Sequence, residues 1–388
     1  MRAAEYASAI ADDLDAVVEL TGRLVAIDSP SDAPEGIGAV CDALAPAARA
    51  AGCDVAISPL AGCGPVLDAR LRLGGGGASI LLLGHSDTVW PVGTAAAWPF
   101  REDSGWLYGP GVGDMKCCIA TALCAIAALG RGRPPGLGEL RLLIVPDEEQ
   151  GSTRSRPLIE AAARDATACL VLEAARPGGG VVTGRGAVGA MRIVGAGSGR
   201  HVTDPGERAS ALAPLAALVG PIEGLSPGGG DAVASVGRLV AGSARQIVPE
   251  QGELLVDLRA PTTEAAERLA DAIRALVDAT PRAPAVTLSV EGGVTRPAWP
   301  RDAGSLGLYA LAAAAGDELG VALHELVERG GSDASLVGAS GLPTLDGLGP
   351  VCHDSCSRSE RVALAGIPIW GAILASVAAA AARGSRPG

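Results

Sequence analysis

Five side chains in three separate segments have the types and spacing that metal-assisted hydrolysis requires. His85 and Asp87 stand two residues apart after an apolar run, so the carboxylate can orient an imidazole ligand. Glu148 and Glu149 are adjacent, and one can act as a general base while the other binds a metal. Glu173 ends a wholly apolar run, where a carboxylate requires a cation or hydrogen-bond donors. Each pattern alone also occurs in solvated loops, so the prediction depends on their convergence.

The surrounding sequence predicts elements that bring these side chains together. Residues 79–84, 140–145 and 168–172 are short apolar runs typical of buried parallel strands, and an alanine-rich helix is expected at 118–129. This order predicts an α/β domain with a mostly parallel central sheet flanked by helices. Ligands of such sheets bind beyond the carboxyl ends of the strands. Asp114 lies in the glycine-dense segment 109–114, where the backbone can approach an ion closely.

A second module is expected inside the first. Strands are predicted at 187–194, 234–239, 252–259 and 285–291, and helices at 207–219 and 263–279. Glycine-rich segments flank this α+β unit. We therefore predict a catalytic domain in two parts, 1–183 and 294–388, interrupted by a smaller domain at 184–293.

Composition excludes some classes of protein and favours others. The chain has 388 residues, of which 48% are hydrophobic and 19% charged, as in a folded protein of two domains. A net charge of -12 argues against a nucleic-acid partner. Nine cysteines without a regular framework indicate reduced thiols and a cytoplasmic protein. The acidic amphipathic N-terminus is unlike a signal peptide. The uncharged segment 362–382 could span a bilayer by length, but it consists mostly of small residues, so we expect a buried helix and no membrane.

Taken together, the motifs resemble those of binuclear zinc peptidases of the M20 family, most closely the glutamate-carboxypeptidase branch. The resemblance extends from about residue 15 to about residue 380 and therefore covers most of the chain. The matching segments are 84–94, 99–100, 108–111, 114–116, 186–189, 248–250, 256–259, 296–297, 330–334 and 343–351.

The resemblance implies a role for each of the chemical side chains. Asp114 would bridge two zinc ions, His85 and Glu173 would bind one of them, and Glu149 would bind the other. Asp87 would orient His85, and Glu148 would be the general base. The peptide bond between Asp114 and Met115 would be cis.

The resemblance also implies a homodimer formed through the inserted domain, which would act as a lid. His201 is the candidate for a histidine that reaches the partner's site and stabilises the oxyanion. Arg296 and the Gly331–Ser332 turn would bind the substrate carboxylate. Gln246 stands where the family has an asparagine, and we count it among the substrate-binding candidates.

The last metal ligand of the family is a histidine, and this chain departs from the pattern there. Counting forward from Pro350 or back from Glu360 leads to Cys356, whereas His353 lies three residues earlier. Cys356 as a thiolate ligand, His353 as a shifted ligand, and a site with one metal or none are the three interpretations.

The sequence therefore predicts a zinc-dependent amidohydrolase or carboxypeptidase. It would cleave an amide between an acyl or aminoacyl group and a small amino acid with a free carboxylate, using two zinc ions and Glu148. Two alternatives remain: a biosynthetic relative that forms amides or transfers acyl groups, and a non-catalytic relative that binds a ligand at an altered metal site.

Overall fold

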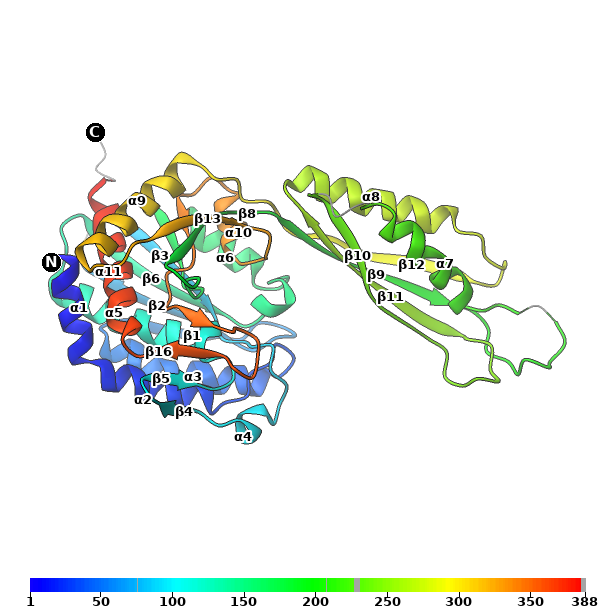
Figure 1. Ribbon diagram of the computed structural model, residues 1–388, viewed down its shortest axis with the longest axis horizontal. Coiled ribbons are helices and arrows are strands. Elements are labelled where there is room, and N and C mark those ends of the chain that lie inside the picture. Colours follow the sequence, from blue (N-terminus) through cyan, green and yellow to red (C-terminus); the bar gives the residue numbers. More distant parts are fainter. Residues whose placement is uncertain (75, 207, 227–230, 385–388) are drawn as a thin grey trace. The chain divides into compact units, whose positions relative to one another are not determined.

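The computed structural model describes residues 1–74, 76–206, 208–226 and 231–384, and the chain divides into two compact units (Figure 1). Unit 1 comprises Met1–Gly184, Arg301–Val327 and Ser332–Gly388. Unit 2 comprises Arg185–Pro300 and Glu328–Gly331. The sequence placed the second boundary at 293/294, because Gly292 and Gly293 look like a linker. Both glycines instead lie inside a strand that continues to Arg296.

Unit 1 is built on a six-stranded sheet in the order β1-β2-β6-β3-β7-β14. β3 pairs in parallel with β6 and β7, and β14 continues the parallel part, whereas β1 and β2 form an antiparallel edge. The mostly parallel α/β fold predicted from the sequence is therefore confirmed. The bounds are β1 Asp54–Ser58, β2 Val66–Arg72, β3 Ala78–His85, β6 Leu137–Val145, β7 Ala168–Val171 and β14 Thr344–Leu345.

Apolar helices build the core of unit 1. α5 is buried along most of its length and contacts α11, which also packs against α1 and α9. Two helical segments, Val112–Gly132, which contains α5, and Gly366–Arg383 within α11, are long and apolar enough to cross a bilayer, yet 83% and 61% of their apolar windows are buried inside the structure. The acidic amphipathic N-terminal segment forms two helices that meet at Asp13. The bounds are α1 Ala3–Asp12, α2 Leu14–Val25, α3 Pro34–Ala50, α5 Cys117–Gly132, α6 Arg156–Arg164, α9 Ala303–Glu318, α10 Ala334–Gly338 and α11 Gly366–Gly384.

Short strands complete unit 1. A four-stranded sheet has the order β15-β16-β5-β4, and β13 pairs with β8. The bounds are β4 Arg101–Asp103, β5 Trp106–Tyr108, β8 Gly180–Arg185, β13 His324–Glu328, β15 Cys352–His353, β16 Arg361–Ala363, and α4 Thr94–Ala97.

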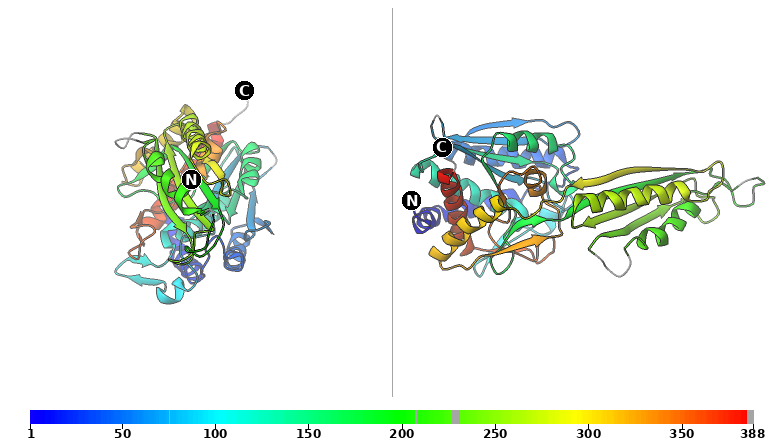
Figure 2. Two further views of the ribbon diagram at one scale, coloured as in Figure 1. Left: turned by 90° about the vertical axis from the view of Figure 1, so that its right-hand side faces the viewer. Right: turned by 90° about the horizontal axis from the view of Figure 1, so that it is seen from above.

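Unit 2 is an antiparallel sheet in the order β10-β11-β9-β12, with α7 and α8 packed on one face (Figures 1 and 2). The helices share one apolar core with alternate residues of β9 and β11, as a half-buried sheet requires. The first of the two helices predicted for this unit was expected to begin at residue 207, which lies outside the described residues, whereas α7 begins at Leu212. The last strand was expected at 285–291, and the observed strand, β12, is shifted toward the C-terminus and ends at Arg296. The bounds are β9 Ala187–Ala196, α7 Leu212–Glu223, β10 Val233–Ala241, β11 Gln251–Ala260, α8 Thr263–Ala279 and β12 Thr287–Arg296.

Candidate metal centre

The carboxyl ends of β3, β6 and β7 carry the acidic cluster. β3 ends at His85, β6 at Val145 just before the Glu148–Gln150 turn, and β7 at Val171 just before Glu173. His85 Nε2 lies 3.2 Å from Asp114 Oδ1 and 3.7 Å from Glu173 Oε1. The side chains that the sequence proposed from distant segments therefore meet at one sheet edge.

Two overlapping sets of donors have the spacing of metal ligands. One set is His85, Glu148 and Glu173, and the other is His85, Asp114 and Glu149. Within each set the donor atoms lie within 4.8 Å of one another. Ligands at about 2.0–2.2 Å from a zinc ion are separated by about 3–4 Å, so modest side-chain adjustment suffices for coordination. Imidazole and carboxylate donors together suit zinc and related divalent ions.

The electrostatics of the cluster call for a cation. Burial raises the pKa of Glu149 to about 8, and the charge of Asp114 adds to this shift. Burial also raises the pKa of Glu173 well above its usual value, again with a contribution from Asp114. Glu149 Oε1 is buried without a hydrogen-bond partner among the described residues. A divalent cation would stabilise the ionised carboxylates and satisfy this oxygen, so the residues fit a metal.

Asp87 organises both the imidazole and the Glu148–Glu149 turn. His85 Nδ1 lies 2.9 Å from the Asp87 carbonyl oxygen and 3.3 Å from Asp87 Oδ1, so Nδ1 carries the proton and Nε2 is left for an ion. The Asp87 carboxylate also accepts the backbone N–H groups of Glu148 (3.2 Å) and Glu149 (3.0 Å). The Ser31 hydroxyl donates to Asp87 Oδ2 at 2.6 Å. The sequence suggested only the contact with His85, and nothing local marks Ser31.

Glu360 fixes the loop that carries Asp114. Its Oε1 accepts the backbone N–H groups of Gly113 (2.8 Å) and Asp114 (3.2 Å), and its side chain is fully buried. The Asp114–Met115 peptide bond is cis, as the resemblance implied. In the sequence, Glu360 marked only the end of the segment that contains Cys356. The one sequence signal for its role was its position, four residues after the candidate metal ligand Cys356.

Cys356 and His353 occupy different surroundings. Cys356 Sγ lies 3.9 Å from Asp114 Oδ2, and the neighbouring Ser355 hydroxyl donates to the same oxygen at 3.3 Å. The His353 ring instead packs edge-to-face on Trp106, with centroids 5.2 Å apart. The structure thus brings Cys356 next to the acidic cluster. Neither residue belongs to the two donor sets described above.

The predicted substrate-binding residues are divided between the units. Ser332, in unit 1, is fully buried, and its hydroxyl accepts the backbone N–H of Ala334 at 3.1 Å. Arg296 and Gly331 lie together in unit 2, where a Cβ at Gly331 would come within 3.2 Å of the Arg296 guanidinium. Arg296 is 6% exposed. The chain therefore passes from unit 2 to unit 1 between Gly331 and Ser332.

His201 and Gln246 lie side by side in unit 2. The backbone N–H of Val202 donates to the Gln246 carbonyl oxygen at 3.0 Å, and His201 forms a β-bridge with Ile247. Both side chains are exposed. His201 Nδ1 lies 2.7 Å from Thr203 Oγ1. The two candidates thus belong to two exposed loop segments joined by an isolated β-bridge.

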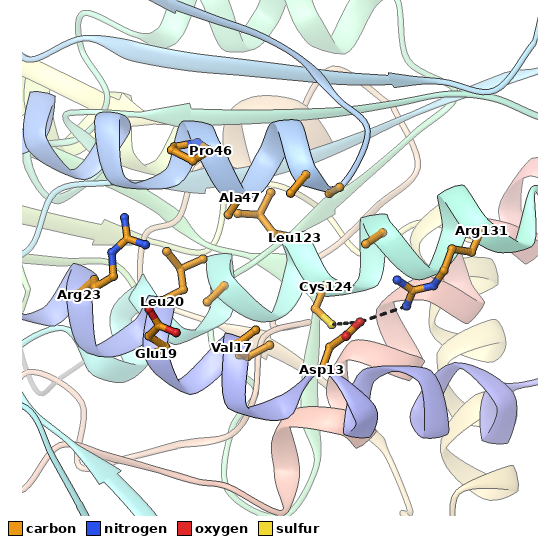
Figure 3. A pocket seen from close by; sticks show the side chains of 15 residues that line it. Asp13, Val17, Glu19, Leu20, Arg23, Pro46, Ala47, Leu123, Cys124 and Arg131 are labelled. Carbon is orange, nitrogen blue, oxygen red and sulfur yellow. Dashed lines mark hydrogen bonds and ion pairs between the residues drawn. The ribbon is translucent and has the colours of Figure 1, made fainter.

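A separate cavity of about 490 Å³ lies between α2, α3 and α5 (Figure 3). Leu20, Ala47 and Leu123 give it an apolar lining. Asp13 at its edge is ion-paired with Arg131 at 3.2 Å. None of the predicted site residues lines it.

Comparison with known proteins identifies relatives over most of the chain. The model of a family described as peptidase family M20/M25/M40 matches residues 81–380. Carboxypeptidase G2 from Pseudomonas sp. is 28% identical over 371 residues, which cover 93% of this chain and 88% of that protein. Succinyl-diaminopimelate desuccinylase from Thioalkalivibrio sulfidiphilus is 32% identical over 232 residues, 54% of this chain and 60% of that protein.

Solved structures share the fold at lower sequence identity. Human carnosine dipeptidase 1 superposes with a TM-score of 0.74 at 16% identity and covers 97% of this chain and 99% of its own. The dipeptidase Dug1p from Saccharomyces cerevisiae has a TM-score of 0.78 at 13% identity and covers 99% of both chains.

Proposed function

The chain belongs to peptidase family M20/M25/M40, and on that premise we propose that it is a zinc-dependent amidohydrolase or carboxypeptidase. It cleaves the amide between an acyl or aminoacyl group and a small amino acid with a free carboxylate. The observation that carries this proposal is the convergence of His85, Asp114, Glu149 and Glu173 next to Glu148.

The donor geometry supports a division of the ligands between two zinc ions. His85 and Glu173 would hold one ion and Glu149 the other, and Asp114, 3.2 Å from His85 and in one donor set with Glu149, would be shared by both. Cys356, beside Asp114, would be the remaining ligand. When bound, zinc polarises the substrate carbonyl and lowers the pKa of a water molecule.

Glu148 performs the proton transfers. Its backbone N–H is held by Asp87, which places the buried side chain in the His85 cluster. Glu148 accepts a proton from the attacking water as the oxygen bonds to the acyl carbon, and it then delivers this proton to the leaving nitrogen. The C–N bond breaks, and the products are a carboxylic acid and a free amino acid.

We assign the binding of the substrate carboxylate and dimerisation to unit 2. The Arg296 guanidinium, with the Gly331–Ser332 turn, binds the amino acid's carboxylate through its two-pronged N–H geometry. His201 and Gln246 lie on two exposed loop segments joined by a β-bridge, which suits a lid that completes the site of a second copy in a cytoplasmic homodimer.

Product analysis in ¹⁸O-labelled water tests the reaction class. We expect zinc-loaded protein to release free amino acids from a panel of N-acyl amino acids and to place one ¹⁸O atom in each released acid. If an added amine instead yields a new amide that contains no ¹⁸O, the reaction is acyl transfer and not hydrolysis. Absence of any turnover across the panel would instead favour a non-catalytic protein.

Substitution of Cys356 tests its assignment as a ligand. We expect Cys356→Ala to lower the zinc content from about two ions per chain to about one, because its sulfur lies beside Asp114 and a thiolate binds zinc well. His353→Ala should keep both ions, because that ring packs on Trp106. Cys63→Ala is the matched control for loss of a thiol outside the cluster. Elemental analysis after dialysis measures all four proteins, and metal loss in His353→Ala alone would reverse the assignment.

A further inference from the structure

An arginine stacked on two tryptophans borders the metal loop. The rings of Trp90 and Trp98 meet edge-to-face with centroids 5.3 Å apart. The Arg358 guanidinium carbon lies 5.5 Å from the Trp90 centroid and 5.6 Å from the Trp98 centroid. Cation–π contacts with both rings hold the guanidinium in place. These three side chains form what we call the Arg358 platform.

The Arg358 platform is tied to the acidic cluster through both of its segments. Trp90 follows Asp87 by three residues, and Glu360, which accepts the backbone N–H groups of the Asp114 loop, follows Arg358 by two residues. Arg358 follows Cys356 by two residues, a span of at most about 7 Å along the backbone. Cys356 Sγ is itself 3.9 Å from Asp114 Oδ2. The backbone of the platform therefore lies next to residues of the proposed metal centre.

No carboxylate among the described residues forms an ion pair with Arg358. Arg101 and Arg361 also stack on aromatic rings, but Arg101 is ion-paired with Asp103 at 2.9 Å and Arg361 with Asp354 at 2.5 Å. Within the part of the chain that the structure describes, no ion pair engages Arg358, which is exposed. An oriented guanidinium with open N–H groups is suited to bind a carboxylate through two hydrogen bonds. In a chain of net charge -12, this guanidinium offers a positive charge near the acidic cluster to which a substrate carboxylate can bind.

We propose that Arg358, held by Trp90 and Trp98, is a specificity-determining residue that binds a carboxylate on the acyl side of the substrate. The preferred substrates are then amino acids acylated by a short dicarboxylic acid. This inference rests on the proposed function, in which Arg296 takes the carboxylate of the amino acid, so that Arg358 is left for the acyl end.

A pair of matched substrates isolates the effect of the acyl carboxylate. An N-glutaryl amino acid and its N-glutaramoyl analogue differ only by the replacement of a carboxylate with a carboxamide. We expect the zinc-loaded protein to favour the glutaryl substrate in kcat/KM, and Arg358→Gln to reduce this preference about tenfold. Arg101→Gln is the control, because it also removes an exposed arginine stacked on a ring, and it should keep the preference. An unchanged preference in Arg358→Gln would overturn the proposal.

Ligand binding provides a readout that does not depend on turnover. Titration of the zinc-loaded protein with glutarate and with glutaramate, followed by tryptophan fluorescence, compares one and two carboxylates on the same carbon chain. We expect glutarate to bind more tightly, and Arg358→Gln to abolish the difference between the two ligands. Equal dissociation constants in the unaltered protein would refute the role of Arg358. If glutarate binding requires Arg358 but neither the N-glutaryl nor the N-glutaramoyl amino acid is hydrolysed, the proposed function is wrong, whereas the carboxylate-binding role of Arg358 is retained.

Discussion

Replacement of Glu148 by glutamine should lower kcat by about a thousandfold or more while both metal ions remain bound. Glutamine preserves the size of the side chain and leaves the backbone N–H to Asp87 intact, but its amide cannot accept the proton of the attacking water. General-base catalysis contributes about 10²–10⁴-fold to enzymatic rates, and the same group also protonates the leaving nitrogen here. Turnover of an N-acyl amino acid and zinc content, measured on one preparation, test both parts.

The adjacent glutamate supplies the contrast. Glu149 lies in the donor set with His85 and Asp114, so Glu149→Gln should lose metal as well as activity. Glu148 also lies within 4.8 Å of His85 and Glu173, the spacing of a ligand. If Glu148→Gln loses zinc and Glu149→Gln keeps it, the two roles are exchanged. If Glu148→Gln retains full activity, the proton transfer belongs to another group.

The sequence predicted the architecture well where a chemical motif coincided with the end of an apolar run. His85, the Glu148 turn and Glu173 each follow a buried strand of one sheet, and parallel strands necessarily place such ends at one edge. Alternation of apolar residues likewise located the strands of unit 2, whose inner face packs on α7 and α8.

The supports of the site were not predictable in this way. Ser31 and Glu360 reach the centre through side-chain hydrogen bonds that join segments far apart in the chain, so no local periodicity reports them. The buried Asp333 similarly accepts a hydrogen bond from Ser152, next to the Glu148 turn. The domain boundary predicted at Gly292 and Gly293 was wrong. Both glycines have positive φ angles but lie within β12. Local composition cannot distinguish a glycine in a strand from a glycine in a linker.

Substitution of Asp87 by asparagine should weaken metal binding about 10–100-fold and reduce kcat/KM by at least a similar factor. The Asp87 carboxylate accepts hydrogen bonds from the N–H groups of Glu148 and Glu149 and from the Ser31 hydroxyl. Its Oδ1 also lies 3.3 Å from His85 Nδ1, which carries the proton. An asparagine offers one acceptor oxygen and turns an NH₂ group toward these donors, which leaves buried groups unsatisfied at a cost of about 1–3 kcal/mol. Loss of such outer support of a metal ligand has an effect of this size.

Asp28→Asn separates this effect from a general loss of stability. Asp28 also accepts two backbone N–H groups, those of Gly93 (2.7 Å) and Ala95 (2.8 Å), but it contacts none of the proposed ligands. Both variants should unfold at lower temperature, whereas only Asp87→Asn should require more zinc for half-saturation. Equal zinc affinity in the two variants would mean that the carboxylate of Asp87 stabilises the fold without orienting His85. The hydrogen bonds to Glu148 and Glu149 would then be sufficient to explain its burial, and orientation of the imidazole would depend on the Asp87 carbonyl oxygen at 2.9 Å.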